Sequence, residues 1–471
     1  MKNKFTSDIV IGIECHVELS TESKLFCGCA THGTEEPNSR TCPTCLGHPG
    51  SKPVLNKKAV EYAIKLGLAL NCKISPELIF SRKSYFYPDM SKNYQITQYE
   101  IPLATEGKLK IDSGKEIGLT RVHMEEDPAS LVHPAGMQKS SYVLVDYNRS
   151  GDPLAEIVTE PDLTSPEEAR DFMKKLISVL NYLEIFDVNR CLIKADANIS
   201  IKETNYTRVE IKNITGFKEI ERALNYEVER QKQNIKEIEH ETRAWDSDKG
   251  ITFSLRKKEA EEEYGYIIDP DLVKIEITND MIKKIKSEMP ELAEEKLKKY
   301  EKEHGTVQSI SVIVKDPKLA HFFEKVISDK EIDTKTASHW VELELKRVLN
   351  YNKKSIDETK LRPEHLIGII KLIQAKKITD QTGRKLMEEL VDKDLDINDY
   401  VKKQGLETIS DQTEIEKHCK QTIKENPQAV EQYNNGGEKA LHFLVGQVMR
   451  KTKGKAKPDL VNKLIKELIK Q

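Results

Sequence analysis

The sequence contains no hydrophobic run long enough to cross a membrane and no strong excess of either charge. A membrane-spanning helix needs about 20 consecutive apolar residues, and no segment approaches that length. Lysine and arginine number 75 against 78 aspartates and glutamates, which leaves a formal net charge of −3. A uniformly basic nucleic-acid-binding surface is therefore excluded, and any RNA would have to meet a local cluster of positive charge.

Features of secreted proteins are also lacking. The first residues lead directly into the apolar run Ile9–Ile11, without the longer apolar core of a signal peptide. The 471 residues include only 8 cysteines, which does not resemble a disulfide scaffold. We therefore expect a cytoplasmic protein with reduced thiols.

The distribution of secondary-structure signals predicts an α+β protein with more than one domain. Strand-like and helix-like stretches alternate up to about residue 275, as at the buried strand Ile9–Ile13 and the capped helix Lys57–Leu70. From about Asn279, glycine becomes rare and helical periodicity persists to the end. We expect a mixed α/β domain over residues 1–292, an all-α domain over residues 293–405 and a small all-α tail over residues 406–471.

Apolar residues at helical spacing predict the individual helices. In the first domain, Ser165 and Pro166 open one helix, and Phe217–His240 is expected to form a second, long helix. Short strands are expected at Ala197–Ile201 and Arg208–Ile211. Further helices are expected at Met281–Met289, Leu319–Ile327, Ser338–Leu349, Pro363–Ala375, Asp380–Leu390 and Ala440–Met449.

The strongest local motif consists of four cysteines in two close pairs. Cys27 and Cys29 are followed, after a short gap, by Cys42 and Cys45. Two thiol pairs joined by a short loop can supply four thiolates to one tetrahedral zinc ion. Two buried reduced pairs, or a redox dithiol at Cys42 and Cys45, are the alternatives. Because a closed four-thiolate site has no open position, we expect this zinc to be structural.

A second set of motifs is acidic and lies at strand ends. On a strand, Glu14, His16 and Glu18 would share one face. Glu156 lies within an apolar stretch, where an unpaired carboxylate would be costly. Carboxylates with histidine nearby suit a hard cation used in phosphate chemistry, whereas solvated charge is the alternative for any single residue. Further segments of this kind are His123–Asp127, Asp146–Arg149 and Asp196–Asn198.

Two basic segments complete the candidate sites. Phe80–Gln95 interleaves basic and aromatic residues, which could clamp a phosphate and stack a base, or could anchor a core. Arg450–Lys457 is strongly basic, as an RNA-backbone contact would be, although most charge runs are only solvated.

Taken together, these segments resemble the B subunit of the bacterial and archaeal glutamyl/aspartyl-tRNA amidotransferases. The motifs occur in the family's order along essentially the whole chain. They are Ile11–Leu19, the four-cysteine motif, Arg82–Asp89, Gln95–Tyr99, Met124–Asp127, Asp146–Gly151, Glu156–Asp162, Asp196–Ser200, Glu210–Asn213, Glu241–Arg243 and Phe443–Gln447.

The resemblance implies a cradle-shaped catalytic domain, a helical domain and a tail that contacts tRNA. It also implies two partners, an amidase (the A subunit) that releases ammonia from glutamine and the small C subunit of the same complex. The implied enzyme is a carbon–nitrogen ligase that phosphorylates the side-chain carboxylate of Asp-tRNA(Asn), Glu-tRNA(Gln) or both with ATP. Channelled ammonia then displaces the phosphate, and Mg²⁺ neutralises the triphosphate charge. The alternative is a non-catalytic, zinc-containing adaptor that binds tRNA.

The resemblance also assigns roles to residues by motif position. His16, Glu126 and Glu156 correspond to magnesium ligands, and Glu14, Lys83 and Glu126 to catalytic residues. The implied substrate- and nucleotide-binding residues are Arg82, Tyr85, Tyr87, Asp89, Asn148, Arg149, Asp196 and Asn198. The implied tRNA-binding residues are Lys451, Lys453, Lys455 and Lys457.

Three positions depart from the family pattern. Cys15 stands where the family more often has valine, and Pro128–Ser130 replaces Ala-Gly-Lys. Gly265 replaces an arginine of the motif that ends at Asp271. These changes indicate a divergent member of the family and not a different function.

Overall fold

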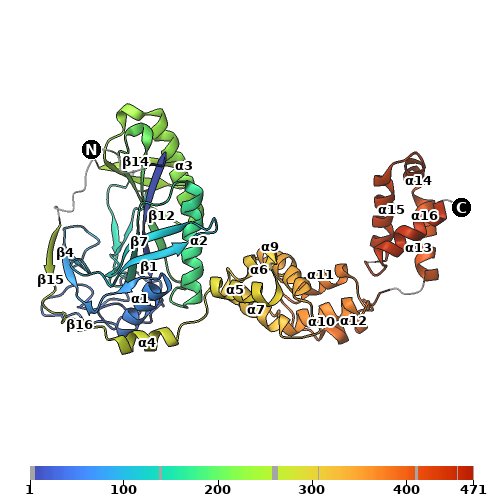
Figure 1. The fold of residues 1–471 in the computed structure, drawn as a ribbon, viewed down its shortest axis with the longest axis horizontal. Coiled ribbons are helices and arrows are strands. Elements are labelled where there is room, and N and C mark those ends of the chain that lie inside the picture. The colour runs from blue at the N-terminus through green and yellow to red at the C-terminus, as the bar shows by residue number, and fades with distance from the viewer. Residues whose placement is uncertain are drawn as a thin grey trace. The chain divides into compact units, whose positions relative to one another are not determined.

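The computed structural model describes residues 6–136, 140–256, 264–305, 307–408, 412–452 and 454–469. The chain divides into two compact units, Met1–Leu292 and Ala293–Gln471. All strands found among these residues belong to the first unit, and the second unit is helical (Figure 1). The predicted α+β class is confirmed.

A nine-stranded sheet forms the centre of the first unit. Its neighbouring strands are antiparallel, except for the parallel pair β12–β13. In sheet order the strands are β14 (Ile251–Arg256), β13 (Glu241–Asp246), β12 (Val209–Thr215), β11 (Ile193–Ile201), β1 (Ile9–Glu18), β10 (Pro153–Thr159), β7 (Glu116–Glu126), β6 (Ala104–Lys110) and β2 (Lys73–Ile74). The strand β1 therefore lies between β11 and β10, near the middle of the sheet.

One face of this sheet is covered by helices α1 (Lys57–Ala69), α2 (Pro166–Tyr182) and α3 (Phe217–Gln233), which share its hydrophobic core (Figure 1). Alternate residues of β1, including Cys15, belong to that core. The Cys15 thiol lies 3.3 Å from the sulfur of Met173 in α2. The intervening residues of β1, including His16, point to the opposite face of the sheet because side chains alternate along a strand. The departure at Cys15 is thus on the other side of the sheet from His16.

Smaller sheets and turns border the large sheet. The three-stranded sheet has the order β15 (Gly265–Ile268), β4 (Ser81–Ser84) and β5 (Tyr94–Thr97). Two further pairs are β16 (Ile275–Glu276) with β3 (Glu77–Leu78), and β8 (Ser130–Val132) with β9 (Leu144–Asp146). Helix α4 (Asn279–Ser287) and the short helices η1 (Lys202–Thr204) and η2 (Ile235–Glu237) complete the unit.

The long helix expected over Phe217–His240 is shorter than predicted. Helix α3 ends at Gln233, and η2 follows it. The apolar stripe of α3 is interrupted after Val228, and the Asn234 side chain donates a hydrogen bond to the Arg230 carbonyl at 2.9 Å. Asparagine favours such local bonds at helix ends, which explains the earlier stop.

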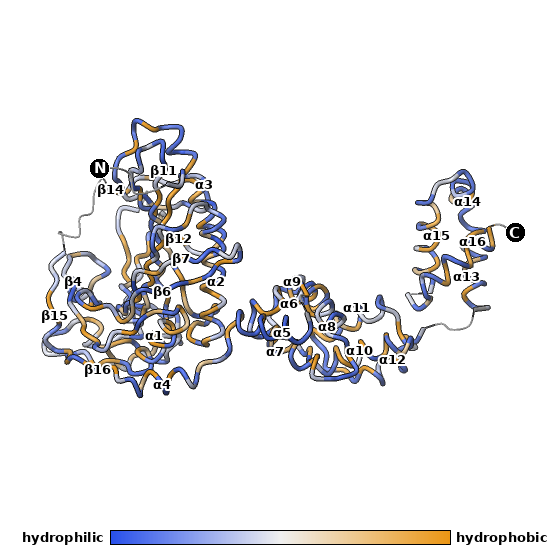
Figure 2. Tube along the Cα trace, in the orientation of Figure 1, coloured by the Kyte–Doolittle hydropathy of each residue, from blue (hydrophilic) through white to orange (hydrophobic). Residues whose placement is uncertain are grey.

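The second unit contains amphipathic helices around two separate hydrophobic clusters, one from Tyr300 to Val401 and one from Ile415 to Ile465. Figure 2 shows hydrophobic and hydrophilic residues alternating along these helices. The predicted boundary at residue 405 falls between the two clusters, and the three-domain division stays a prediction. The helices are α5 (Ala293–His304), α6 (Gln308–Ile313), α7 (Pro317–Ile327), α8 (Thr334–His339), η4 (Trp340–Leu345), α9 (Lys346–Asn352), η5 (Ile356–Glu358), α10 (Pro363–Gln374), α11 (Asp380–Glu389), α12 (Ile397–Lys403), α13 (Gln412–Glu425), α14 (Pro427–Asn434), α15 (Glu438–Lys451) and α16 (Pro458–Ile469).

The helices predicted in this half of the chain are present, with ends shifted by a few residues. The stretch predicted as Ser338–Leu349 is one continuous run of α8, η4 and α9 with a π-helical centre. Across the described ranges, none of the helices combines the length and apolar character that a membrane span requires.

Candidate functional site

Three side chains from three neighbouring strands meet on the face of the sheet opposite α1, α2 and α3. His16 of β1 lies directly across from Glu156 of β10, and Glu125 comes from the adjoining strand β7. The His16 Nε2 atom is 3.4 Å from a Glu156 oxygen and 3.7 Å from a Glu125 oxygen. Ligand atoms of the three residues all lie within 4.8 Å of one another. One cation can therefore contact all three, which we call the His16 cluster.

His123 adds a second imidazole beside Glu156. Its Nε2 atom lies 3.1 Å from the same Glu156 oxygen that His16 contacts. Its Nδ1 atom is buried and has no hydrogen-bond partner among the described residues. The sequence placed His123 in an acidic segment but assigned it no role. Strands β10 and β7 pair so that Glu156 lies opposite His123, and this register brings His123 to the site.

The charges of the His16 cluster depend on one another. Burial lowers the pKa of His16, but the hydrogen bond and charge of Glu156 outweigh it and raise the pKa to about 10. Burial favours protonation of Glu156, but the two histidines hold its pKa well below the usual range. Burial and the charge of Glu156 raise the pKa of Glu125. Without a cation, the cluster thus holds a proton on His16, which a metal ion would displace because only a neutral imidazole binds metal.

Glu126 lies apart from the His16 cluster. It follows Glu125 in β7 and therefore points to the other side of the strand. The two Glu126 oxygens lie 2.5 and 2.7 Å from Lys92 Nζ, and one of them accepts the backbone N–H of Ile96 at 2.8 Å. The structure thus brings Glu125, not Glu126, next to His16. The sequence could have indicated Glu125, because side chains alternate along a strand and residues 123 and 125 therefore share a face.

A second acidic cluster adjoins the first on the same face. Glu14 of β1, Asp196 of β11 and Glu210 of β12 have oxygens within 4.8 Å of one another. Lys212 bridges two of them, with Nζ 3.1 Å from Asp196 and 2.8 Å from Glu210. Asn198 donates a hydrogen bond to Glu14 at 3.1 Å. Burial, Glu156 and these neighbouring acids raise the pKa of Glu14.

Glu210 and Lys212 belong to one of the motifs that carried the family resemblance, but they were not assigned roles from the sequence. Their place beside Glu14 and Asp196 follows from the pairing of β12 with β11. The two clusters therefore form a continuous polar surface across β7, β10, β1, β11 and β12. That surface can hold divalent cations and the phosphates that accompany them.

Arg82 is held by acidic residues of the neighbouring segment. Its Nε and one terminal nitrogen lie 2.8 Å from Asp269 and 3.1 Å from Asp271. Its guanidinium lies 4.5 Å from the centre of the Tyr94 ring. Much of its charge is thus compensated within the chain. Gly265, where the family has arginine, is exposed and pairs with Ser84 on the same small sheet.

Lys83 and Tyr85 lie near the His16 cluster. The Lys83 Nζ atom is 4.6 Å from the Tyr264 ring centre, and Tyr85 packs edge-on against that ring. The charge of Lys83 opposes the rise in the pKa of Glu125. Tyr87 is exposed, and Asp89 is half-buried with one carboxylate oxygen lacking a partner among the described residues.

The four cysteines of the predicted zinc motif, Cys27, Cys29, Cys42 and Cys45, come together in what we call the knuckle. Their sulfur atoms all lie within 4.8 Å of one another, and the sulfurs of Cys42 and Cys45 are 3.9 Å apart. A tetrahedral zinc with bonds of about 2.3 Å requires sulfurs about 3.8 Å apart, so the spacing fits. The Cys42 N–H donates to the Cys45 sulfur at 3.1 Å. Hydrogen bonding from Cys27 outweighs burial and lowers the pKa of Cys45 to about 5.

Asn148 and Arg149 connect the knuckle to strand β7. Asn148 accepts the backbone N–H of Arg40 at 2.8 Å and donates to the Glu36 carbonyl at 2.7 Å. Arg149 pairs with Asp127 at 2.8 Å and donates to the carbonyls of Pro128 and Ala129. Both side chains are thus engaged within the protein, and their role in nucleotide binding stays a prediction.

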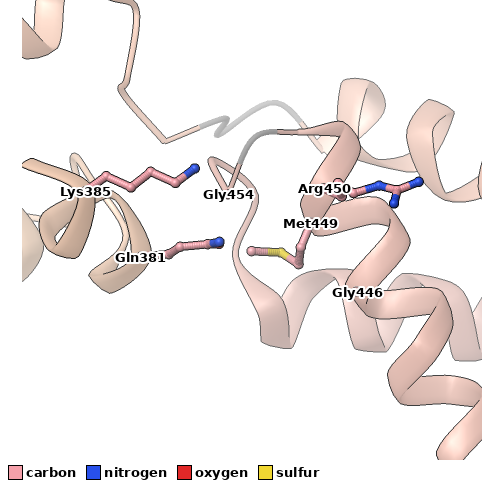
Figure 3. A pocket seen from close by; sticks show the side chains of 6 residues that line it. All are labelled: Gln381, Lys385, Gly446, Met449, Arg450 and Gly454. Carbon is pink, nitrogen blue, oxygen red and sulfur yellow. The ribbon is translucent and has the colours of Figure 1, made fainter. Parts of the chain in front are cut away.

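The tail lysines differ in exposure. Lys451 Nζ lies 2.5 Å from Glu425, Lys455 is half-buried and Lys457 is exposed. Lys453 lies outside the described residues. Next to them, helices α11 and α15 line an open pocket of about 470 Å³. Figure 3 shows its lining residues Gln381, Lys385, Gly446, Met449, Arg450 and Gly454.

Known proteins resemble the chain along nearly its full length. Residues 9–283 match the GatB/GatE catalytic domain, and residues 321–469 match the GatB domain. The B subunit of the aspartyl/glutamyl-tRNA(Asn/Gln) amidotransferase of Thermodesulfovibrio yellowstonii is 44% identical over 481 residues, which cover 98% of this chain and 99% of that protein. The proteins of the same name from Thermoanaerobacter sp. (strain X514) and Thermotoga maritima are each 42% identical, over 98% of both chains. Both acidic clusters and the knuckle lie within the first matched region.

Proposed function

Because this chain belongs to the family of aspartyl/glutamyl-tRNA(Asn/Gln) amidotransferase B subunits, we propose that it activates and amidates an amino acid attached to tRNA. Its substrate would be the side-chain carboxylate of Asp-tRNA(Asn), Glu-tRNA(Gln) or both. ATP would phosphorylate that carboxylate, and ammonia would then replace the phosphate. The protein would act in the cytoplasm, in protein biosynthesis.

The observation that carries this proposal is the continuous polar surface with two adjacent acidic clusters. His16, Glu125 and Glu156 would hold Mg²⁺, which neutralises phosphate charge during phosphoryl transfer when bound. Asp196 and Glu210, beside Glu14, would contact a further cation or the nucleotide's magnesium. Glu126, the ligand expected from the motif, is paired with Lys92 and would act through that lysine.

The chain's own side chains would serve both chemical steps. A carboxylate is a poor electrophile, and phosphorylation turns its oxygen into a good leaving group. Lys83 would place its positive charge beside the phosphate oxygens, close to Glu125. In the second step the C–N bond forms as the C–O bond to phosphate breaks. The amide nitrogen must lose a proton, and a carboxylate with a raised pKa such as Glu14 is suited to accept it.

Ammonia would come from the amidase, or A, subunit, which hydrolyses glutamine in a complex that also contains the small C subunit. The predicted tRNA contacts of Lys451, Lys453, Lys455 and Lys457 belong to the same proposal. Zinc in the four-cysteine knuckle would be structural, because four thiolates leave no open coordination position.

The test is to compare ATP consumption with amidated tRNA in the reconstituted complex. Glu125→Gln removes one proposed magnesium ligand, and we expect both quantities to fall together by at least about 100-fold. Glu116→Gln is the matched control, because this glutamate lies on the same strand in an exposed ion pair. A non-catalytic adaptor would leave ATP consumption unchanged in both variants, and that result would reject the proposed function.

A further inference from the structure

Lys24 is a lysine with no exposed surface at all, in the loop between β1 and the first cysteine pair. A buried ammonium is costly unless its charge and its hydrogen bonds are compensated. Within the part of the chain that the structure describes, no carboxylate lies within ion-pair distance of its Nζ atom. Its contacts are instead the Ser150 carbonyl at 2.7 Å, the Tyr147 carbonyl at 3.4 Å and the Cys45 sulfur at 3.9 Å. The Cys45 sulfur is thus in direct contact with the ammonium, whose charge also acts on the buried Asp152 carboxyl nearby.

The knuckle needs such a positive charge when it holds zinc. Four thiolates around Zn²⁺ carry a formal net charge of about −2. Beside Lys24, the Cys45 sulfur also accepts the Cys42 backbone N–H at 3.1 Å. Charge-assisted donors of this kind are the outer contacts that stabilise metal ligands. Of these two donors to the Cys45 sulfur, Lys24 is the one that carries a full positive charge.

Lys24 also connects the knuckle to the turn over residues 147–151. The Leu25 N–H donates to the Gly151 carbonyl at 2.9 Å, next to the Lys24 bonds to this turn. Gly151 has a φ of +92°, and a Cβ atom there would meet the Cys45 Cβ and the Lys24 Cδ, each at 3.5 Å. Turn, lysine and knuckle are therefore in direct contact.

The same turn reaches the end of β7. The Gly151 N–H donates to the Asp127 carbonyl at 2.9 Å, and Arg149 pairs with the Asp127 carboxylate at 2.8 Å. Asp127 follows Glu125 and Glu126 directly in the chain. Contacts thus run continuously from the sulfur site, through Lys24 and the turn, to the acidic residues of β7.

We propose that Lys24 is a positioning residue that compensates the charge of the metal-bound knuckle and ties it to the turn 147–151. With zinc bound, the ammonium is held between the thiolates and the two carbonyls. Without zinc, no ion holds the four sulfurs together beside the ammonium, and the contact between Lys24 and Cys45 is less firmly fixed. Zinc occupancy therefore controls how firmly the turn is held.

The first test measures zinc retention in the full chain. Lys24→Met keeps the length of the side chain and removes its charge, and Lys57→Met is the control because the Lys57 side chain is 89% exposed. Zinc per chain is measured by mass spectrometry, and its release is followed with the chelating dye 4-(2-pyridylazo)resorcinol. We expect Lys24→Met to bind zinc at least about tenfold more weakly, and Lys57→Met to match wild type. Affinity within twofold of wild type in Lys24→Met would overturn the proposal, as would wild-type chain free of zinc.

The second test uses the wild-type chain and does not depend on how the variant folds. Hydrogen–deuterium exchange is measured for peptides covering residues 146–152, before and after zinc removal and after zinc is restored. We expect exchange in these peptides to become at least about tenfold faster without zinc and to recover on its return. Unchanged exchange would overturn the coupling. Neither readout uses ATP or tRNA, so failure here is distinguishable from failure of the proposed function.

Discussion

The two faces of the nine-stranded sheet have different chemistry, although the same strands build both. In β1, Cys15 is fully buried against Met173, whereas the next residue, His16, lies among carboxylates. In β10, Ile157 belongs to the hydrophobic core, whereas Glu156 contacts two histidines. Because side chains alternate along a strand, a slip of one residue would exchange the two faces. One register thus serves both the stability of the fold and the proposed chemistry.

The largest effect is expected on the polar face. Glu156→Gln removes the carboxylate charge that contacts both His16 and His123. We expect kcat/KM for ATP-dependent amidation by the reconstituted complex to fall on the order of 10³-fold, about 4 kcal/mol of transition-state stabilisation. The measurement is amide formed on mischarged tRNA. A fall of less than tenfold would contradict the assignment of this face to catalysis.

The neighbouring residue on the other face is expected to affect stability. Ile157→Ala leaves a cavity in a fully buried position and should lower the free energy of unfolding by about 3 kcal/mol. Urea unfolding checks this, with Val158→Ala, a half-buried position on the polar face, as the control. Amidation per folded molecule should stay close to wild type. If Ile157→Ala instead lowered activity as strongly as Glu156→Gln, the two faces would not be functionally distinct.

A third effect is expected at Asp152, a buried residue directly before β10. Burial raises the pKa of Asp152 to about 8, against an ordinary value near 3.8. Between these values the folded state retains a proton that the unfolded state has lost, so stability falls as pH rises from about 4 to 8. Asp152→Asn carries no charge at any pH and should therefore be more stable than wild type at pH 8.

The same variant should show a much smaller gain at pH 4, close to the ordinary pKa, where the unfolded-state carboxyl is still partly protonated. Urea unfolding at the two pH values measures the difference. Asp280→Asn, at a position with a 93% exposed side chain, serves as the control. An equal gain at both pH values would mean that Asp152 acts through packing and not through its charge.

Much of the local structure could be predicted because short-range rules decide it. Asn56 caps α1 through its side chain and Ser165 caps α2, as expected from their residue types. The shared face of Glu14, His16 and Glu18 follows from the alternation of a strand. Helix α3 ended before the predicted residue, because the hydrophobic stripe stopped and Asn234 bonded to its own backbone.

The composition of the acidic clusters could be predicted only in part. The motifs predicted His16, Glu126 and Glu156 as magnesium ligands. The structure places Glu125 beside His16 and Glu156, and the ligand assignment stays a prediction. Adjacent residues of a strand differ in direction, and motif position alone does not say which one faces the site. Lys92, the partner of Glu126, lies within the basic and aromatic segment Phe80–Gln95, but no role was predicted for it.

By itself, the amino-acid sequence determined the α+β class, the order of the family motifs and the pairing of four cysteines into one candidate zinc site. These depend on residue type and on spacing along the chain. Only the tertiary structure decided that Glu125 meets His16, that Asn148 holds the knuckle and that Lys24 is buried against it. Such contacts depend on the register of strands far apart in the chain, because pairing and burial bring together residues that no local pattern relates.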